Sequence, residues 1–209
     1  MSLFAPNPTG QPTPAVAEGT AQEIEAMLLR EPAEILTFVG YSAAEYEDPA
    51  GMLAQARQVL AACDPHETVV NIGATEQGIG AVYALAKVMG FGTLGVVSTL
   101  ARLQNMPLSP WVDRVCFVHD LAWGGVIPGT VELSPTSTVI VNISHRLVGI
   151  GGGEAARDEL LAARRAGLPV VFFPADMNHR IAYGKAARQG LPPPEMFCGA
   201  AHAAWMAAF

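Results

Sequence analysis

The stretch Leu147–Leu160, which reads LVGIGGGEAARDEL, decides the fold class of this chain. It opens with a short apolar run that favours a buried strand. It then passes through Gly151–Gly153 into Glu154–Ala166, a segment with helical character. Glycines between a strand and a helix let backbone N–H groups approach a ligand closely, and the helix N-terminus adds roughly half a positive charge. The stretch therefore predicts a turn that holds a phosphate without a lysine side chain.

Short apolar segments alternate with helix-forming segments along most of the chain. The expected strands are Ile35–Gly40, Thr68–Gly73, Thr93–Ser98, Arg114–His119, Leu147–Ile150 and Val170–Pro174. The expected helices are Ala21–Leu29, Pro49–Cys63, Gly80–Met89 and Glu154–Ala166. Buried strands separated by helices favour a parallel sheet that is covered on both faces. We therefore expect a single doubly wound α/β domain with a mainly parallel sheet of six or seven strands.

One segment allows two interpretations. Ser137–Ile143 is rich in β-branched residues, which locally favour a strand. The preceding pair Ser134-Pro135 is a good helix start, with serine as the N-cap and proline at the first helical position. A helix that runs to about His145 leaves room for the strand at Leu147, so the pattern favours the helix.

The two ends of the chain differ in composition from its middle. Residues 1–19 contain four prolines together with Gly, Thr and Ser, which predicts a poorly ordered arm. Residues 20–190 form the expected nucleotide-binding domain. Residues 191–209 begin with a run of prolines and continue with Ala, Met, Trp and Phe. This apolar content predicts a tail that packs on the domain or on a partner subunit.

Composition excludes several classes of function. The formal net charge of −7 disfavours a non-specific nucleic-acid surface. No apolar run approaches the roughly 20 residues that cross a bilayer, so we expect no membrane partner. The three widely spaced cysteines and the absence of a signal-peptide pattern favour a cytoplasmic protein with free thiols. The five histidines are scattered without zinc spacing, so we expect no metal and no cofactor.

Glycines and hydroxyl groups follow three of the expected strands. In open parallel sheets ligands bind beyond the carboxyl ends of the strands. Gly40 and Ser42 follow the first strand, a glycine-rich loop over residues 73–80 follows the second, and the triple glycine follows the fifth. A single such loop is explained equally well by turn geometry, but all three lie at one edge of the predicted sheet. They favour a shared cleft, although the dinucleotide fingerprint and the Walker pattern are both absent.

The triple-glycine stretch resembles a known motif. Residues 151–160 are similar to the P-G-G-x-G-T-x-x-E-L signature of the "lysine decarboxylase-like" LOG family, whose members are phosphoribohydrolases. The segment from Asn71 to Gly80 resembles that family's second glycine loop, and the likeness extends over about residues 35–176. The resemblance implies a Rossmann-like fold, frequent dimers and a phosphate bound at the helix after the glycine loop.

The chain departs from the family motif at several positions. Gly151 stands for the family's proline, Ala155 for its third glycine and Ala156 for its threonine, so a phosphate-binding hydroxyl is lost. The motif's acidic residue is retained as Glu159. The region 132–137 has no counterpart of the family's catalytic arginine. The resemblance therefore supports the fold and the location of the site more than the family's reaction.

Each candidate site residue has a structural alternative. Glu159 is the candidate catalytic carboxylate, or else a solvated helix residue. Arg157 contacts either a ligand phosphate or a neighbouring carboxylate, and Glu76 meets either a ribose hydroxyl or a helix N-terminus. The pair His119-Asp120 binds a base, with Trp123 stacked on it, or else its loop forms a dimer contact. The candidate ligand-binding residues are Gly40, Ser42, Gly73, Thr75, Glu76, Gly78, Gly80, His119, Asp120, Gly151, Gly152, Gly153, Glu154 and Arg157.

Two functions remain open from the sequence. The first is a protein that binds a nucleotide or ribosyl phosphate without catalysis, which the missing threonine and arginine favour. The second is a hydrolase that cleaves the N-glycosidic bond of a nucleoside 5′-monophosphate with Glu159, because a carboxylate near C1′ can stabilise an oxocarbenium-like transition state. In either case we expect a homodimer or a higher homo-oligomer.

Overall fold

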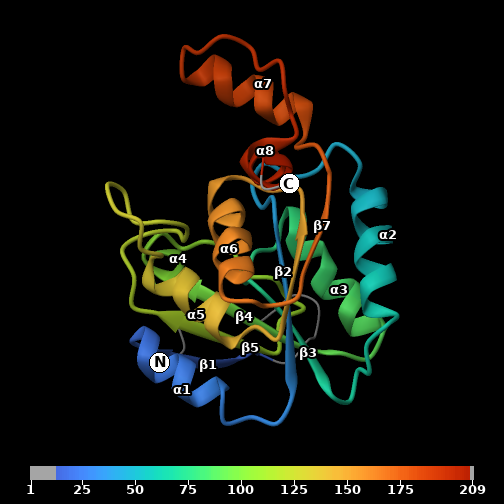
Figure 1. Cartoon of the computed structure of the whole chain (residues 1–209), viewed down its shortest axis with the longest axis vertical. Helices are drawn as coiled ribbons and strands as arrows, with labels where there is room; N and C mark the ends of the chain where they lie inside the picture. Colours follow the sequence, from blue (N-terminus) through green and yellow to red (C-terminus); the bar gives the residue numbers. More distant parts are fainter. Residues whose placement is uncertain (1–12, 208–209) are drawn as a thin grey trace.

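A seven-stranded parallel sheet forms the centre of the molecule (Figure 1). The computed structural model describes residues 13–207. The strands are β1 (Ala15–Gly19), β2 (Glu34–Gly40), β3 (Thr68–Ile72), β4 (Gly92–Ser98), β5 (Arg114–Val118), β6 (Arg146–Ile150) and β7 (Val170–Phe173). Their order is β1-β5-β4-β3-β2-β6-β7, and every neighbouring pair is parallel.

Helices cover both faces of this sheet. They are α1 (Ala21–Leu28), α2 (Pro49–Leu60), α3 (Ala81–Val88), α4 (Leu100–Leu103), α5 (Pro135–Ile143), α6 (Glu154–Arg165), α7 (His179–Arg188) and α8 (Gly199–Ala207), with a 3₁₀ turn η1 at Gly78–Gly80. Helices α2 and α3 pack on one face, and α1, α5 and α6 pack on the other (Figure 1). The expected doubly wound, Rossmann-like α/β fold is confirmed.

The order of the strands reverses at β2. From β2 the chain builds outward through β3, β4 and β5 in one direction, and through β6 and β7 in the other. When β1 and β5 are left out, the order is β4-β3-β2-β6-β7. With these five strands renumbered in chain order from β2, it reads 3-2-1-4-5, as in a Rossmann sheet. The ends of β2 and β6 therefore flank the switch point, where ligands bind in such sheets. Here the loop at Gly40 lies beside the triple glycine, because Gly40 pairs with Ile150.

The β-branched segment before β6 is a helix, as the capping pattern predicts. Ser134 is the N-cap of α5 and accepts a hydrogen bond from the Ser137 N–H, and Pro135 occupies the first turn. The apolar side of α5 packs against the sheet together with α1. Burial of that side outweighs the weak local preference of β-branched residues for a strand.

The interpretation of residues 1–19 as a poorly ordered arm needs a correction. Ala15–Gly19 form the edge strand β1, which pairs in parallel with β5, whereas residues 1–12 lie outside the described residues. The five residues of β1 are small or half-exposed, so the strand has no apolar run to announce it. Thr20 then starts α1 with a capping box that includes Glu23.

Two helices that the sequence pattern did not predict follow β7. Helix α7 projects from the body of the molecule at the top of Figure 1, and α8 packs against α6. The Ala201 N–H of α8 donates to the Gly152 carbonyl oxygen over 3.1 Å. The Trp205 ring lies 5.5 Å from the Phe172 ring of β7.

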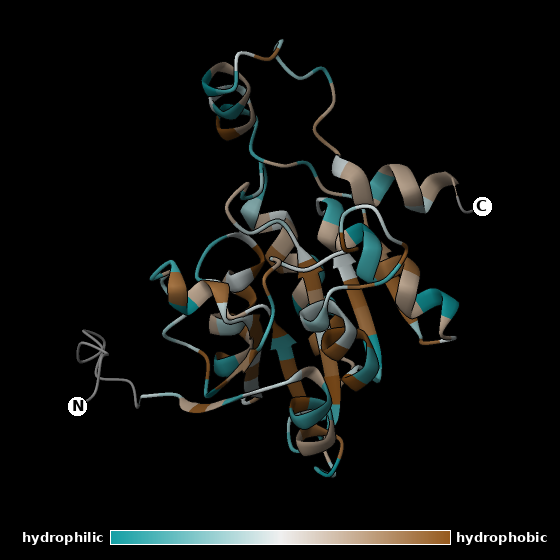
Figure 2. Cartoon of the chain, turned by 90° about the vertical axis from the view of Figure 1, so that its left-hand side faces the viewer, coloured by the Kyte–Doolittle hydropathy of each residue, from teal (hydrophilic) through white to brown (hydrophobic). Residues whose placement is uncertain are grey.

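The hydropathy of the chain follows these layers. Figure 2 shows hydrophobic residues along the central strands and hydrophilic residues on the outer turns of the helices. Within residues 13–207, no helix combines the length and apolar character needed to cross a membrane.

Candidate functional site

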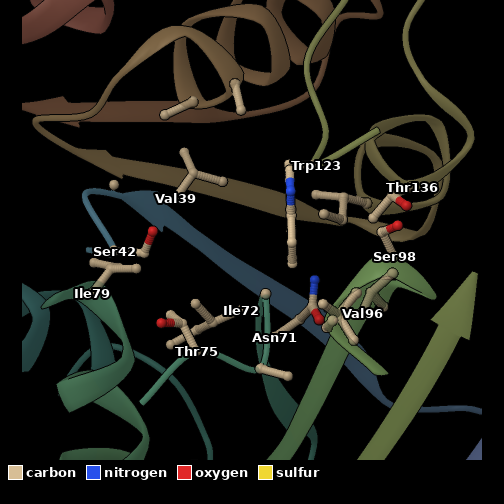
Figure 3. A pocket seen from close by; sticks show the side chains of 18 of the residues that line it. Val39, Ser42, Asn71, Ile72, Thr75, Ile79, Val96, Ser98, Trp123 and Thr136 are labelled. Carbon is tan, nitrogen blue, oxygen red and sulfur yellow. The ribbon is translucent and has the colours of Figure 1, made fainter. Parts of the chain in front are cut away.

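A pocket of about 460 Å³ lies at the carboxyl edge of the sheet (Figure 3). Its sheet wall comes from the ends of β2, β3 and β4, and its opposite wall comes from α5, α6 and the indole of Trp123. Residues 104–108, which follow α4, line another part. The lining residues include Thr37, Gly40, Ser42, Asn71, Gly73, Thr75, Val96, Trp123, Thr136, Ile140, Ala155, Ala156 and Glu159.

A backbone hydrogen bond joins the loop that follows β2 to the loop that follows β3. The Ile79 N–H donates to the Tyr41 carbonyl oxygen over 2.7 Å. A Cβ atom on Gly78, whose φ is +60°, would lie 2.2 Å from that same oxygen. This close approach explains the glycine without a ligand. Gly80 is buried in η1, while the Glu76 side chain is exposed and does not line the pocket.

Gly40, Ser42, Gly73 and Thr75 do line the pocket. They come from the two loops that follow β2 and β3. The expected meeting of these loops at one edge of the sheet is therefore seen in the structure.

The triple glycine lies behind the pocket rather than in its wall. Gly152 has φ +127°, and a Cβ atom there would lie 2.5 Å from the Ala156 Cβ. Its carbonyl oxygen accepts the hydrogen bond from α8. Gly151 and Gly152 are therefore packed beneath Tyr41 and α8. The residues that reach the pocket are Ala155, Ala156 and Glu159, on the helix that the glycines introduce.

Helix α6 begins without a side-chain cap. Its N-cap is Gly153, which has no side chain to accept a hydrogen bond. Intrahelical bonding starts with the Arg157 N–H, which donates to the Gly153 carbonyl oxygen. The N–H groups of Glu154, Ala155 and Ala156 therefore have no acceptor within the helix. Two of these residues line the pocket, so the positive end of the helix dipole faces it.

Helix α5, in contrast, is fully capped. Asp120 accepts the Thr136 N–H through Oδ2 at 2.9 Å and the Ala122 N–H through Oδ1 at 2.8 Å. The neighbouring His119 faces Glu18, with 3.5 Å between Nε2 and Oε1. Both residues line a second, more open hollow. The structure therefore does not bring the His119-Asp120 pair to the main pocket, although Trp123 of the same loop does reach it.

Among residues 13–207, Glu159 is the one ionisable side chain that lines the pocket. It is 6% exposed, and its Oε1 accepts a hydrogen bond from Ser137 Oγ over 2.6 Å. Ser137 Oγ in turn accepts the Gly125 N–H over 2.7 Å. Burial, together with the nearby Asp158 carboxylate, raises the pKa of Glu159 to about 7, although the Ser137 hydrogen bond opposes this. Burial therefore favours the neutral form of this carboxyl group more than it would in an exposed glutamate.

Arg157 is engaged by its neighbour on α6. Its Nε donates to Asp158 Oδ1 over 2.8 Å, and Asp158 Oδ2 accepts the Val126 N–H at the same distance. Arg157 does not line the pocket, and neither does any other lysine, arginine or histidine of the described residues. Glu154 is exposed on the first turn of α6. An anion in this pocket would therefore be bound by backbone N–H groups.

The pocket also contains polar residues that the sequence reading did not select. Thr37 is buried in the middle of β2, Asn71 is buried next to the last residue of β3, and Thr136 is buried in the first turn of α5. In the sequence, Thr37 and Asn71 are recognisable as polar residues inside otherwise apolar runs. Such residues are buried with their strand, and a buried polar group needs a hydrogen-bond partner. Within residues 13–207, no group of three or more acidic, histidine or cysteine side chains is arranged to hold a metal ion.

Comparisons with known proteins show similarity at the level of structure alone. No protein-family model matches the sequence, and no curated protein matches it. The chain is similar to the Moco carrier protein from Chlamydomonas reinhardtii, with 20% identity and a TM-score of 0.46 over 84% of this chain and 94% of that one. It is also similar to TM1055, with 18% identity and a TM-score of 0.46 over 66% and 72% of the two chains.

A third similar structure is DNA processing protein A from Streptococcus pneumoniae. The identity is 17% and the TM-score 0.47, over 87% of this chain and 63% of that one. Identities and TM-scores at this level leave the function to be inferred from the site itself. The site lies at the switch point of a Rossmann-like sheet and combines an uncapped helix N-terminus with buried polar groups.

Proposed function

We propose that the chain binds a nucleoside 5′-monophosphate or a similar ribosyl phosphate without catalysis. The phosphate lies at the N-terminus of α6, and the base lies deeper, between the sheet and Trp123. The observation that carries the proposal is the uncapped N-terminus of a 12-residue helix in the wall of a pocket of about 460 Å³. Pockets of this size hold ligands of nucleotide dimensions, and free helix N–H groups bind phosphate.

The lining of the pocket fits this ligand better than a highly charged one. Among the described residues, no cationic side chain lines the pocket, and the chain has a net charge of −7. A single phosphate is matched by a few N–H groups and the helix dipole. The apolar residues Val96, Ile140 and Trp123 supply a surface for an aromatic ring.

Isothermal titration with AMP, GMP, CMP, UMP and ribose 5-phosphate tests the proposal. We expect at least one nucleoside monophosphate to bind, and the same compound to raise the melting temperature. Adenosine and guanosine, which lack the phosphate, should bind more weakly. The absence of binding by all five phosphates would refute the proposal.

A second candidate function is hydrolysis of the N-glycosidic bond, which the buried Glu159 favours. With a pKa of about 7, its carboxyl group can donate a proton to a departing base at neutral pH. Water would attack C1′ as the bond from C1′ to the base nitrogen breaks, and the base would leave with the proton of Glu159. The proton lost by the attacking water would then return the Glu159 carboxylate to its acid form. Release of free base from a monophosphate, lost in Glu159→Gln, would establish this activity. Binding without release supports the first proposal.

The expectation of a homo-oligomer stays a prediction. Large apolar side chains are exposed, among them Leu103, Leu121 and Val131, and the first two line the second hollow. Light scattering coupled to size exclusion measures the mass in solution, with about twice 21.9 kDa expected for a dimer.

A further inference from the structure

Two side chains that line the pocket, Asn71 and Thr37, form a chain of hydrogen bonds with Ser144. Asn71 Nδ2 donates to Thr37 Oγ1 over 3.1 Å. Thr37 Oγ1 and Ser144 Oγ lie 2.6 Å apart, and Ser144 Oγ donates to the Ile140 carbonyl oxygen over 2.6 Å. Asn71 and Thr37 are partners in the register of β3 and β2, and Ser144 ends α5 above them. All three side chains are buried.

The number of available hydrogen atoms sets the direction of this chain. The single hydroxyl hydrogen of Ser144 is used by the Ile140 carbonyl oxygen, so the hydrogen between the two hydroxyl oxygens belongs to Thr37. Thr37 Oγ1 can then only accept from Asn71. The atom of Asn71 that faces Thr37 must therefore be the nitrogen, and the amide cannot be reversed without leaving two oxygens in contact.

This arrangement leaves an acceptor without a donor. Asn71 is 0% exposed, and its Oδ1 has no hydrogen-bond partner among residues 13–207. Thr136 Oγ1 is also buried, lacks a hydrogen-bond partner in the described part of the chain, and belongs to a residue that lines the same pocket. In Figure 3 these two side chains lie on the same side of the pocket as Val96 and Ser98, and Ser42, Thr75 and Ile79 lie on the other side.

Buried polar groups without partners are costly, so an unpartnered group that lines a pocket is a candidate ligand contact. We propose that the bound ligand has a planar ring with an N–H donor, an amino or lactam group, which binds Asn71 Oδ1. The Thr136 hydroxyl, which lacks a partner among the described residues, would bind a second polar atom of the ring. This inference rests on the proposed function, because it places the ring of the ligand whose phosphate binds at α6.

The directed chain acts as a specificity device. Because Thr37 Oγ1 can only accept a hydrogen bond from Asn71, the amide nitrogen of Asn71 must face Thr37. The amide oxygen of Asn71 is then the atom left for a ligand. A ring without an N–H group would leave Oδ1 unpaired inside an apolar wall formed by Val96 and Ile140. A site built in this way discriminates strongly against an analogue that lacks the donor.

Titration calorimetry with a set of matched compounds tests the proposal. AMP and GMP carry N–H donors on the base, purine riboside 5′-monophosphate carries none, and ribose 5-phosphate has no base. We expect AMP or GMP to bind ~10-fold or more tightly than purine riboside 5′-monophosphate. In Thr37→Val the Asn71 amide is free to rotate, and in Asn71→Leu the acceptor is gone. We expect the ratio to fall to about 1 in both variants.

Ribose 5-phosphate serves as the control for both variants, since its affinity should be unchanged while the phosphate site is intact. Thr136→Val independently tests the second unpartnered group, the Thr136 hydroxyl. It should weaken AMP or GMP binding without lowering the melting temperature of the free protein. Equal binding of all three nucleotides, or a preference that survives Asn71→Leu and Thr37→Val, would overturn the inference. If ribose 5-phosphate and every nucleotide fail to bind, the proposed function itself is wrong.

Discussion

Glu159 holds a carboxyl group in a place where ionisation is costly. It is buried against α5, and its pKa is raised to about 7 from the ordinary value of 4.5. At a pH between these two pKa values, Glu159 binds more protons in the folded protein than in the unfolded chain. The free energy of unfolding therefore decreases as the pH rises from about 4.5 to about 7, and the loss persists above pH 7.

Replacing this carboxyl group should change the pH dependence of stability. Glu159→Gln keeps an oxygen that accepts from Ser137 Oγ but cannot ionise. We expect the variant to be more stable than the wild type at pH 8, by on the order of 3 kcal/mol, and similar to it near pH 4.5. Urea unfolding across this pH range measures the difference. Glu154→Gln, on the exposed first turn of the same helix, is the control. An unchanged pH profile in Glu159→Gln would contradict the account.

Single residues also show what the sequence could and could not reveal about the site. The glycine loops predicted that a cleft lies at this edge of the sheet, and Gly40, Ser42, Gly73, Thr75 and Glu159 do line one pocket there. The pattern did not reveal that Gly78 serves a backbone contact, because a glycine needed for packing and one needed for a ligand look the same in sequence. Asn71 was missed because its significance depends on Thr37 and Ser144, which are distant in sequence.

At the scale of the element, the start of α6 is where we propose that the phosphate binds. Gly153 has φ −86°, and a Cβ atom there would meet no atom within 4 Å. A capping side chain would therefore fit without strain, and its absence leaves the helix N–H groups open to a ligand. The capped start of α5, with Ser134 and Asp120, shows the alternative within the same chain.

A capping side chain at position 153 should increase the stability of the protein and weaken the binding of a phosphate ligand. In Gly153→Asp the carboxylate accepts the free N–H groups of α6 and repels a phosphate. We expect the free energy of unfolding to rise by a few tenths of a kcal/mol and phosphate-ligand affinity to fall ~10-fold or more. Thermal unfolding and titration calorimetry measure the two effects. Gly184→Asp on α7 adds the same charge elsewhere and should leave binding unchanged. Retained affinity in Gly153→Asp would place the phosphate elsewhere.

Asp120 should behave as part of the α5 cap rather than as a ligand contact. Asp120→Ala removes the acceptor of two backbone N–H groups, so we expect a loss of about 1–3 kcal/mol in stability. His119→Ala, which removes an exposed side chain from the same loop, should have little effect. Chemical denaturation separates the two. A fully stable Asp120→Ala variant would show that α5 does not depend on this cap.

Elements with strong local signals were predicted well from sequence. Apolar runs marked six of the strands, and Ser134-Pro135 marked the start of α5 correctly. The strand β1 was missed because its five residues include only one large apolar side chain, Val16, and because prolines precede it. Its pairing with β5 is a tertiary contact that a local pattern cannot express.

At the scale of the whole molecule, charge limits the class of ligand. The chain has a net charge of −7, and its pocket wall contains no cation among the described residues. Each additional phosphate would therefore add repulsion without a partner. We expect affinity to decrease from AMP to ADP to ATP in magnesium-free buffer at constant ionic strength, as measured by calorimetry. An affinity that increases along this series would require a cationic surface that the pocket lacks.

The central claim is that backbone N–H groups at the start of α6 bind the phosphate of a nucleotide. Backbone amide chemical shifts, followed by NMR during titration with AMP or GMP, test it most directly. We predict that the largest shifts occur at Glu154, Ala155 and Ala156, and that ribose 5-phosphate reproduces them. Chemical-shift changes at residues around His119 and α4, with none at these three amides, would contradict the account.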